Sequence, residues 1–436
     1  MNESLICANL SVGDEGVLRF AGQDVRALAG YYGTPLYLMD ERRIRDNCRR
    51  YRRAAEESFG GQSCVLYASK AASFRYIYEI VNEEGLHVDV VSPGEIHTAA
   101  AAGFPMERVW FHSNNKSDED IAYAVEMRVG FFVVDCMEEL EALDRIAGEA
   151  GIRQDVLLRV TPGIDPHTFE AVATGKVDSK FGFPMADGQA DEAFHAALRA
   201  ENLALRGFHC HVGSQVFDSD VFLLSAEVML DYMARLRAET GYVAERLDLG
   251  GGYGVRYLPE QPELDIEGNI ACVGAFIRKK CAALGYPMPA ISLEPGRSIV
   301  ADAGLTLYTV GAVKRILGLV NYVSVDGGMT DNVRYAMYHA PYTVLPADRM
   351  NEPRDTVFSV VGRCCESGDV IQPGVPLPDG IRRGDLIAVC TTGAYNYSMA
   401  SNYNRIPRPP VVMLRDGDCF TAVRRESLED LLRLDA

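Results

Sequence analysis

Eight short apolar runs alternate with segments of helical periodicity between residues 64 and 294 of this chain. Each run ends at a polar or glycine-rich cluster, and the segments between them, such as 74–84 and 221–239, repeat apolar residues at helical spacing. A parallel strand buried on both faces gives a continuous apolar run, so this alternation predicts an α/β fold, a (β/α)8 barrel of the TIM type. The eight predicted strands are 64–69, 87–92, 109–113, 131–135, 156–161, 205–212, 247–251 and 291–294.

The alternation stops near residue 300, where β-type runs separated by Gly, Pro and Asp turns take over. This change predicts a barrel over residues 36–300 and a second, mostly β domain over residues 301–436. Residues 1–35 precede the barrel pattern, and we expect them to pack with the β domain. The predicted β runs of the second domain are 305–313, 322–325, 357–361, 386–389 and 411–414.

The connection between residues 161 and 205 is too long for one short barrel loop. We expect it to form an excursion at the top of the barrel, beside the active site. The polar and glycine residues that favour this interpretation are Gly163, Asp165, Pro166, His167, Gly175 and Gly182.

The chain is acidic, with 61 Asp and Glu residues against 43 Lys and Arg residues and a formal charge of −18. Nucleic acids and anionic membranes require positive surfaces, so neither is an expected partner. The eleven cysteines are odd in number and scattered without a C-x-x-C pair, which argues against a disulfide framework and favours a reducing compartment. Because no window approaches 18 apolar residues and no leader is evident, we expect a cytoplasmic protein.

In this fold the chemistry lies at the carboxyl ends of the strands, so the residues that close each run are the candidates. The first run ends at Lys70, which is costly to bury unless it is paired or used chemically, although a lysine that only reaches the rim is an equally good interpretation. His209 and His211 close the sixth run on one strand face. No carboxylate or third histidine at suitable spacing completes a metal site around them, so no metal is predicted and a ring that stacks on a planar cofactor is favoured.

Glycines 250–252 close the seventh run, and their missing β-carbons would let backbone N–H groups approach a phosphate. The eighth run ends with Glu294 and Arg297, which by themselves favour a structural ion pair. Taken together, a reactive amine, a stacking ring, a glycine loop and a carboxylate for a pyridine nitrogen indicate a site for pyridoxal 5'-phosphate (PLP).

On these residues the chain resembles the fold-type III PLP decarboxylases, in particular the branch that acts on meso-diaminopimelate. The resemblance extends from about residue 33 to residue 410, so it includes the barrel and continues through most of the β domain. The matching segments are 67–70, 112–117, 174–176, 179–182, 211–215, 250–252, 294–297, 326–329, Arg334 with Tyr338, 365–369, 393–395 and 398–399.

The resemblance implies that Lys70 carries PLP covalently, that His211 stacks on the ring, and that Glu294 pairs with the pyridinium nitrogen. A protonated ring nitrogen makes the cofactor an electron sink, which loss of CO2 requires. Cys365 matches the residue that returns a proton to the substrate carbon. The implied cofactor contacts also include Ser214, Gly251, Gly252, Gly296, Arg297 and Tyr395, and the implied substrate contacts are Arg297, Arg334, Tyr338, Glu366 and Tyr395.

The implied reaction is decarboxylation of meso-2,6-diaminopimelate to L-lysine and CO2, the last step of lysine biosynthesis. The substrate carries a zwitterion at each end, so one end must be held while the other reacts. Arg334 can hold the distal carboxylate with two parallel hydrogen bonds, and Glu366 can hold the distal ammonium. Lysine and ornithine have no distal carboxylate for this arginine to bind.

In the resembled family the segment around Cys365 reaches the active site of the other subunit, which implies a homodimer. Cys364 and Cys365 could instead fill the core, as most free cysteines do. Three other functions remain open: a PLP decarboxylase for another amino acid with a charged distal end, a non-catalytic PLP-binding barrel protein, and a racemase. The β domain argues against the second, and Glu294 against the third, because a racemase is expected to place an arginine at the pyridine nitrogen.

Overall fold

The computed structural model describes residues 5–164 and 179–436 and divides into two compact units. The barrel unit combines Asn47–Gly254 with Leu264–Gly296. The β unit combines the chain up to Asp46 with Val255–Glu263 and Arg297–Ala436. Each unit is described separately below.

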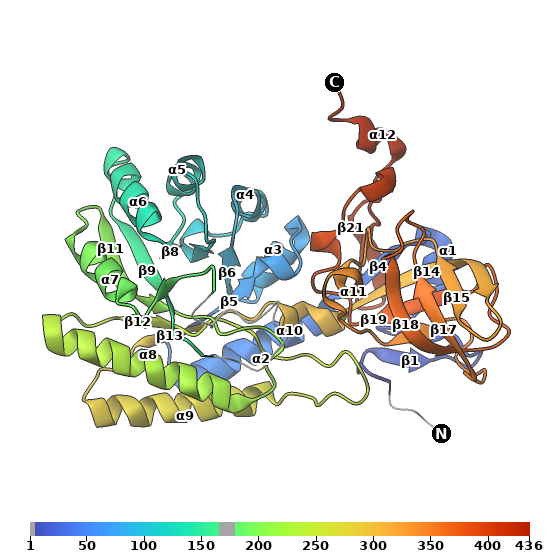
Figure 1. The fold of residues 1–436 in the computed structure, drawn as a ribbon, viewed down its shortest axis with the longest axis horizontal. Coiled ribbons are helices and arrows are strands. Elements are labelled where there is room, and N and C mark those ends of the chain that lie inside the picture. Colours follow the sequence, from blue (N-terminus) through green and yellow to red (C-terminus); the bar gives the residue numbers. More distant parts are fainter. Residues whose placement is uncertain (1–4, 165–178) are drawn as a thin grey trace. The chain divides into compact units, whose positions relative to one another are not determined.

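The barrel unit contains a closed parallel sheet of eight strands, as the alternating pattern predicted (Figure 1). The sheet closes because β8 pairs with β9. Leu66, Trp110, Val133 and Leu157 come from four of the strands and form a fully buried cluster. In chain order the strands are β5 (Cys64–Ala68), β6 (His87–Val90), β7 (Val109–Phe111), β8 (Phe131–Val134), β9 (Gln154–Thr161), β11 (Leu203–His209), β12 (Arg246–Asp248) and β13 (Ala290–Leu293).

Amphipathic helices follow the strands, because each helix buries one apolar stripe against the sheet. Local residues fix where they begin: Ser117, for example, caps α5 and forms a capping box with Asp120. Helices α8 and α9 lie side by side (Figure 1). Lys280 of α9 forms ion pairs with Glu227 and Asp231 of α8. The helices are α3 (Arg75–Glu83), α4 (Pro93–Ala101), α5 (Asp118–Glu126), α6 (Met137–Glu149), α7 (Gln189–Arg199), α8 (Ser219–Thr240) and α9 (Ile266–Leu284), and α2 (Glu41–Phe59) spans the boundary between the units.

The described part of the long connection after β9 contains one short strand and one helix. The short strand β10 (Phe183–Pro184) pairs in parallel with β9, and α7 follows before β11. Gly163 and Gly182 lie within the described residues, whereas the expected contributions of Asp165, Pro166, His167 and Gly175 fall outside them.

The β unit is built on a mixed sheet in the order β18-β17-β15-β14-β4-β20-β21, and β19 pairs with β14 and β16. A smaller sheet contains β1, β2 and β3. Buried apolar residues from the N-terminal segment, such as Phe20 and Val25, share one core with Leu307 and Ala388. The strands are β1 (Leu10–Val12), β2 (Leu18–Phe20), β3 (Gln23–Asp24), β4 (Leu36–Asp40), β14 (Gly304–Arg315), β15 (Asn321–Val325), β16 (Val344–Pro346), β17 (Thr356–Val361), β18 (Val370–Leu377), β19 (Leu386–Cys390), β20 (Val411–Arg415) and β21 (Asp418–Val423).

The N-terminal boundary differs from the expected break after residue 35. Strand β4 lies inside the β unit, antiparallel to β14 and parallel to β20. These pairings bury all five of its residues, so residues 36–46 belong with the β unit instead of the barrel.

The five β runs predicted after residue 300 are all strands, but β16, β18 and β21 were not predicted. Strand β18 contains Pro373 and Pro376, which cannot donate ladder hydrogen bonds and are tolerated because β18 is an edge strand of this sheet. The remaining elements are short. They are α1 (Val25–Tyr32), α10 (Arg297–Val300), α11 (Arg334–Tyr338), α12 (Leu428–Leu432) and the 3₁₀ turns η1 (Ser69–Ala71), η2 (Met106–Arg108), η4 (Ala301–Ala303), η5 (Tyr397–Met399) and η6 (Tyr403–Arg405).

Among the helices of the described residues, none combines the length and the apolar character that a membrane crossing requires.

Candidate active site

Lys70 lies in the turn η1, directly after the first barrel strand. Its Nζ is 3.7 Å from Oδ2 of Asp89, which is buried on the neighbouring strand β6. The ion pair holds the amine toward the carboxyl end of β6. Lys70 therefore lies at the strand ends beside a buried carboxylate, and 47% of its side chain is exposed.

Glu294 follows the last barrel strand, and two histidines contact its buried carboxylate. Oε1 lies 2.8 Å from Nε2 of His112, and Oε2 lies 3.1 Å from Nε2 of His209. His112 follows β7 and His209 ends β11, so three strand ends converge on one carboxylate. The sequence prediction gave no role to His112, although it directly follows a strand, where catalytic residues of this fold lie.

The surroundings of Glu294 favour its ionised form. Burial by itself would raise the pKa of Glu294, but His112 and His209 outweigh burial and hold it well below its ordinary value. Burial lowers the pKa of His209 to about 4, so at neutral pH that ring is uncharged and donates from Nε2. The site therefore contains a buried carboxylate charge.

Asp248 closes β12 and is fully buried near Glu294. Burial, followed by the charge of Glu294, raises the pKa of Asp248 well above its ordinary value, so its neutral form is favoured. The Gly250 N–H donates to Asp248 Oδ1 at 2.8 Å. Two adjacent carboxyl groups thus prefer opposite charge states, a pattern typical of functional sites.

The expectation that nothing completes a metal site around the histidines of the sixth strand is wrong in one respect. The ligand atoms of His112, His209 and Glu294 all lie within 4.8 Å of one another, because barrel closure brings distant strand ends together. Atoms 2.0–2.1 Å from a tetrahedral zinc are about 3.3 Å apart. The 2.8 and 3.1 Å contacts to Glu294 are shorter, and we interpret them as contacts between the imidazoles and the carboxylate.

His211 lies beyond the end of β11, against the glycine loop that follows β12. Its Nδ1 accepts a hydrogen bond from the Gly251 N–H at 3.3 Å, which places the proton of the neutral ring on Nε2. Burial, followed by the charges of Lys70 and Arg159, lowers the pKa of His211 well below its ordinary value. The imidazole is therefore a neutral, oriented ring.

The glycine loop is needed first for close packing. A β-carbon on Gly251 would overlap the Glu294 carbonyl oxygen, and one on Gly252 would overlap that of Gly213. The loop after β11, which carries half-buried Ser214, pairs with the glycine loop through a bridge between Val216 and Tyr253.

Gly296 also needs the absence of a β-carbon, because it packs closely against the end of strand β5. A β-carbon there would lie 2.9 Å from both the carbonyl oxygen and the β-carbon of Ala68, two residues before Lys70. The structure thus brings Lys70, His211, Ser214, Gly251, Gly252, Glu294 and Gly296 to the same end of the barrel unit.

A buried ion pair holds the loop that carries His112. Lys116 Nζ donates to Glu139 Oε1 at 2.7 Å and to the Val133 carbonyl oxygen at 2.8 Å. Neither charged side chain is more than 1% exposed. Since an unpaired buried charge is strongly destabilising, this pair fixes the loop after β7.

Glu139→Gln is expected to lower the thermal unfolding midpoint by roughly 6–10 °C, because it removes the charge that compensates the Lys116 ammonium, at a cost of about 3 kcal/mol. Differential scanning calorimetry measures this effect. Glu138→Gln, at the exposed neighbouring position, makes the same chemical change and should shift the midpoint by less than about 2 °C. Equal shifts in the two variants would rule out this role for the ion pair.

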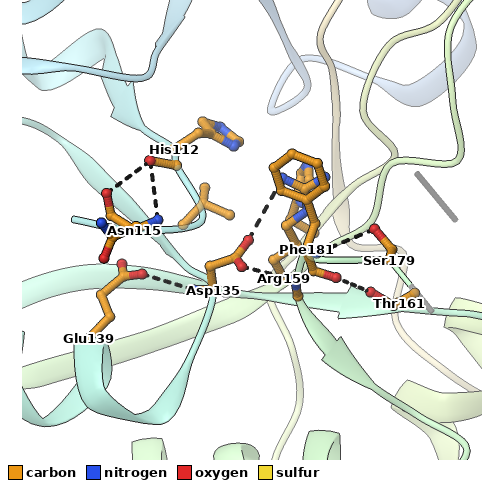
Figure 2. Close-up of polar contacts among 12 residues, drawn as sticks. His112, Asn115, Asp135, Glu139, Arg159, Thr161, Ser179 and Phe181 are labelled. Atoms are coloured by element: carbon orange, nitrogen blue, oxygen red, sulfur yellow. Dashed lines mark hydrogen bonds and ion pairs between the residues drawn. The ribbon is translucent and has the colours of Figure 1, made fainter. Parts of the chain in front are cut away.

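Asp135 and Arg159 connect this region to residues 179–182 (Figure 2). The Asp135 N–H donates to Glu139 Oε2 at 3.0 Å, and Asp135 Oδ2 accepts from the Gly182 N–H at 2.9 Å. The Arg159 guanidinium lies 4.3 Å from the centre of the Phe181 ring. Residues 181 and 182, which lie within the long connection, are thus fixed by the ends of β8 and β9.

In the β unit, Arg297, Arg334 and Tyr395 form a second cluster together with Tyr257. Arg297 and Arg334 are both buried, and their Nη1 atoms donate to the Tyr257 hydroxyl oxygen at 3.0 and 3.2 Å. Their guanidiniums also lie 4.7 and 5.7 Å from the centre of the Tyr395 ring. Tyr395 has a φ of 61°, which is uncommon for a residue with a side chain and is often found at functional sites.

The other predicted residues of the β unit are Tyr338, Cys365 and Glu366. Tyr338 is half-buried at the end of α11, four residues after Arg334. Cys365 and Glu366 are exposed on a turn that Asp369 anchors through the N–H groups of Met329 and Cys364. Both side chains of the turn are therefore available at the surface of the chain.

Comparison with known proteins defines the class first. The pyridoxal-dependent decarboxylase, pyridoxal binding domain family model matches residues 42–301, which contain the whole barrel. Because this match covers more than half of the chain, the chain belongs to the pyridoxal-dependent decarboxylases, and the matched residues include Lys70 and Glu294.

Individual relatives specify the family. The diaminopimelate decarboxylase of Bacillus subtilis is 45% identical over 420 residues, which is 96% of this chain and 95% of the relative. The structure of diaminopimelate decarboxylase from M. jannaschii in complex with L-lysine matches with a TM-score of 0.92 at 34% identity, and the match covers 99% of this chain and 98% of that chain. The Helicobacter pylori enzyme in complex with L-lysine matches with a TM-score of 0.85 at 31% identity, over 94% and 99% of the two chains. The chain therefore belongs to the diaminopimelate decarboxylase family.

Proposed function

We propose that this protein catalyses the PLP-dependent decarboxylation of meso-2,6-diaminopimelate to L-lysine and CO2, the last step of lysine biosynthesis. The observation that carries the proposal is the family relationship over nearly the whole chain, which includes the β unit. The ionised, buried Glu294 argues against the racemase alternative.

The residues at the barrel end fit PLP. Oε1 of Glu294 and Nε2 of His112 are buried, and their 2.8 Å contact lacks the geometry of a hydrogen bond, so Oε1 can still accept one. A carboxylate in this state suits a protonated ring nitrogen. Gly251 and Gly252 have no β-carbons to keep a phosphate from the backbone, and Lys70 offers a primary amine at the same end of the barrel unit.

We infer the following roles from this fit. Lys70 holds the cofactor covalently, His211 supports its ring, and Glu294 holds a proton on its pyridine nitrogen. When bound, PLP supplies the electron sink for the bond that breaks at the α-carbon. The proposed phosphate contacts are Ser214, Gly251, Gly252, Gly296, Arg297 and Tyr395. Because the Gly251 N–H already donates to His211, a phosphate would share that donor or rely on its neighbours.

Arg334 and Arg297 are proposed to hold the distal carboxylate, with Tyr338 and Tyr395 beside it and Glu366 binding the distal ammonium. The strongest support is the environment of Arg334, whose hydrogen bonds go to the hydroxyls of Tyr257 and Tyr342. These neutral partners leave its charge available to an anionic ligand. This feature favours diaminopimelate over lysine or ornithine as the substrate.

The function is tested by incubating the PLP-loaded protein with meso-diaminopimelate and, separately, with L-lysine, L-ornithine and D-lysine. We expect CO2 and L-lysine from meso-diaminopimelate alone. Release of CO2 from another substrate would retain the PLP chemistry but refute the proposed roles of Arg334 and Glu366. If no substrate released CO2, the racemase or the PLP-carrier function would replace this proposal.

We also propose a cytoplasmic homodimer in which Cys365 and Glu366 complete the partner's active site. The proposed location rests on the odd number of scattered cysteines, which does not suggest a disulfide framework. The exposed, anchored turn that carries Cys365 and Glu366 is suited to insertion into a second copy of the chain.

Cys365→Ala is expected to lower kcat about 100-fold without loss of PLP, because Sγ no longer returns a proton to the substrate carbon. Cys364→Ala changes the neighbouring half-buried thiol and serves as the matched control. Turnover by Cys365→Ala equal to that of the control would remove the proton-donor role.

Subunit exchange tests the shared site directly. Lys70→Ala and Cys365→Ala subunits, mixed and reassembled, should recover about one quarter of the wild-type sites, since half of the dimers are hybrids with one intact site each. No recovery from verified hybrid dimers would show that each site is built from one chain.

A further inference from the structure

Tyr257 stands at the centre of the arginine cluster, and its main chain is held firmly. Its carbonyl oxygen accepts hydrogen bonds from the Thr343 N–H at 3.1 Å and from the Thr343 hydroxyl at 2.8 Å. Its N–H donates to Gln261 Oε1 at 2.7 Å. The side chain is buried, with 4% of the residue exposed, and its ring meets Tyr342 edge to face at 5.4 Å. These contacts fix the position of the phenol.

The Tyr257 hydroxyl oxygen accepts one N–H from each of two arginines, Arg297 at 3.0 Å and Arg334 at 3.2 Å. A phenol oxygen has two acceptor sites, so these two donors occupy both. One fixed atom therefore determines where the two guanidiniums lie relative to each other.

The electrostatics of the cluster require an explanation, because two buried guanidiniums close together repel each other strongly. Burial acts to raise the pKa of Tyr257, yet the charges of Arg297 and Arg334 outweigh it and leave the pKa below its ordinary value. The arginines thus impose a strong positive potential on the phenol. An anionic ligand placed between them would relieve the repulsion.

A tyrosine suits this position better than an acidic residue would. A carboxylate at residue 257 would form ion pairs with both arginines and would compete with a ligand carboxylate for them. A neutral hydroxyl holds the guanidiniums in place without cancelling their charge. The cluster can then bind an anion with donors that are already oriented.

We infer that Tyr257 is a positioning residue that holds Arg297 and Arg334 as a two-arginine clamp for one ligand carboxylate. For the identity of that carboxylate, the distal one of diaminopimelate or L-lysine, the inference rests on the proposed function. Tyr257 acts through the arginines and takes no part in the bond that breaks.

The test compares Tyr257→Phe with Tyr253→Phe in the PLP-loaded protein. Both variants remove one buried hydroxyl, but the Tyr253 ring packs on Phe222 and Tyr51 of the barrel unit. Calorimetric titration measures the Kd of L-lysine and of L-lysinamide, whose carboxylate is replaced by a neutral amide. Tyr257→Phe should raise the Kd of L-lysine about tenfold and change the Kd of L-lysinamide by less than about twofold. It should also raise KM for meso-diaminopimelate while kcat changes by less than about threefold. Tyr253→Phe should change none of these values by more than about twofold.

A double-mutant cycle with Arg334→Gln tests whether Tyr257 acts through the arginines. In the Arg334→Gln background, Tyr257→Phe should raise the Kd of L-lysine by less than about threefold, because part of the clamp is already lost. An unchanged L-lysine affinity in Tyr257→Phe, or equal losses for L-lysine and L-lysinamide, would overturn the inference. If the wild-type protein failed to decarboxylate meso-diaminopimelate but the ligand pattern held, the clamp would stand and the proposed function would fall.

Discussion

Lys70→Ala is expected to reduce turnover of meso-diaminopimelate by a factor on the order of 10³ or more. The variant removes the amine that holds PLP covalently, and such nucleophiles dominate the catalysis they support. Treatment with borohydride followed by peptide mass mapping should find PLP attached to the peptide that contains Lys70 in the wild-type protein. No PLP-bearing peptide should appear in the variant.

Lys280→Ala is the matched control, since Lys280 also forms ion pairs with carboxylates but lies on helix α9. It should keep wild-type activity and the same PLP-bearing peptide. Attachment of PLP to a different lysine in the wild-type protein would refute the role of Lys70. In that case its ion pair with Asp89 would be purely structural.

Glu294→Gln is expected to lower kcat by about 10² to 10⁴ while the protein still retains PLP. The amide carries no charge, so it cannot favour a protonated pyridine nitrogen, and its NH2 group would face one of the two histidine Nε2 atoms that now contact the carboxylate. The measurements are kcat at saturating substrate and the amount of PLP released from the denatured protein.

His209→Gln provides the comparison, because a glutamine can still donate a hydrogen bond to Oε2 and the carboxylate charge remains. Its loss of kcat should stay below about tenfold. If Glu294→Gln kept kcat within about threefold of wild type, the buried carboxylate would not be needed for the chemistry, and the racemase alternative would regain support.

The barrel could be predicted from the sequence because each of its strands is a short run of apolar residues. A strand covered on both faces must be apolar along its length, so runs such as the one that ends before Lys70 are visible without knowledge of their neighbours. Chemistry in this fold lies at strand ends, which is why Lys70 and Glu294 were candidates from their positions alone. The resemblance to the decarboxylases then supplied the roles that position could not.

Other features depended on contacts between residues far apart in the chain. The sequence of strand β4 is as apolar as that of a barrel strand. The strand nevertheless pairs with β14 and β20, which follow more than 250 residues later. His112 and His209 reach Glu294 only because the sheet closes. Tyr257 follows a barrel strand in the sequence but belongs to the β unit, where it contacts Arg297 and Arg334.

The sequence by itself therefore determined the class of fold, the order of the barrel strands and the residues at their ends, because burial and periodicity are properties of short segments. The tertiary structure decided which of those residues meet, the charge that Glu294 carries, and the direction in which the arginines point. Hydrogen bonds, ion pairs and desolvation act over a few ångströms in space, and no spacing along the chain encodes those distances.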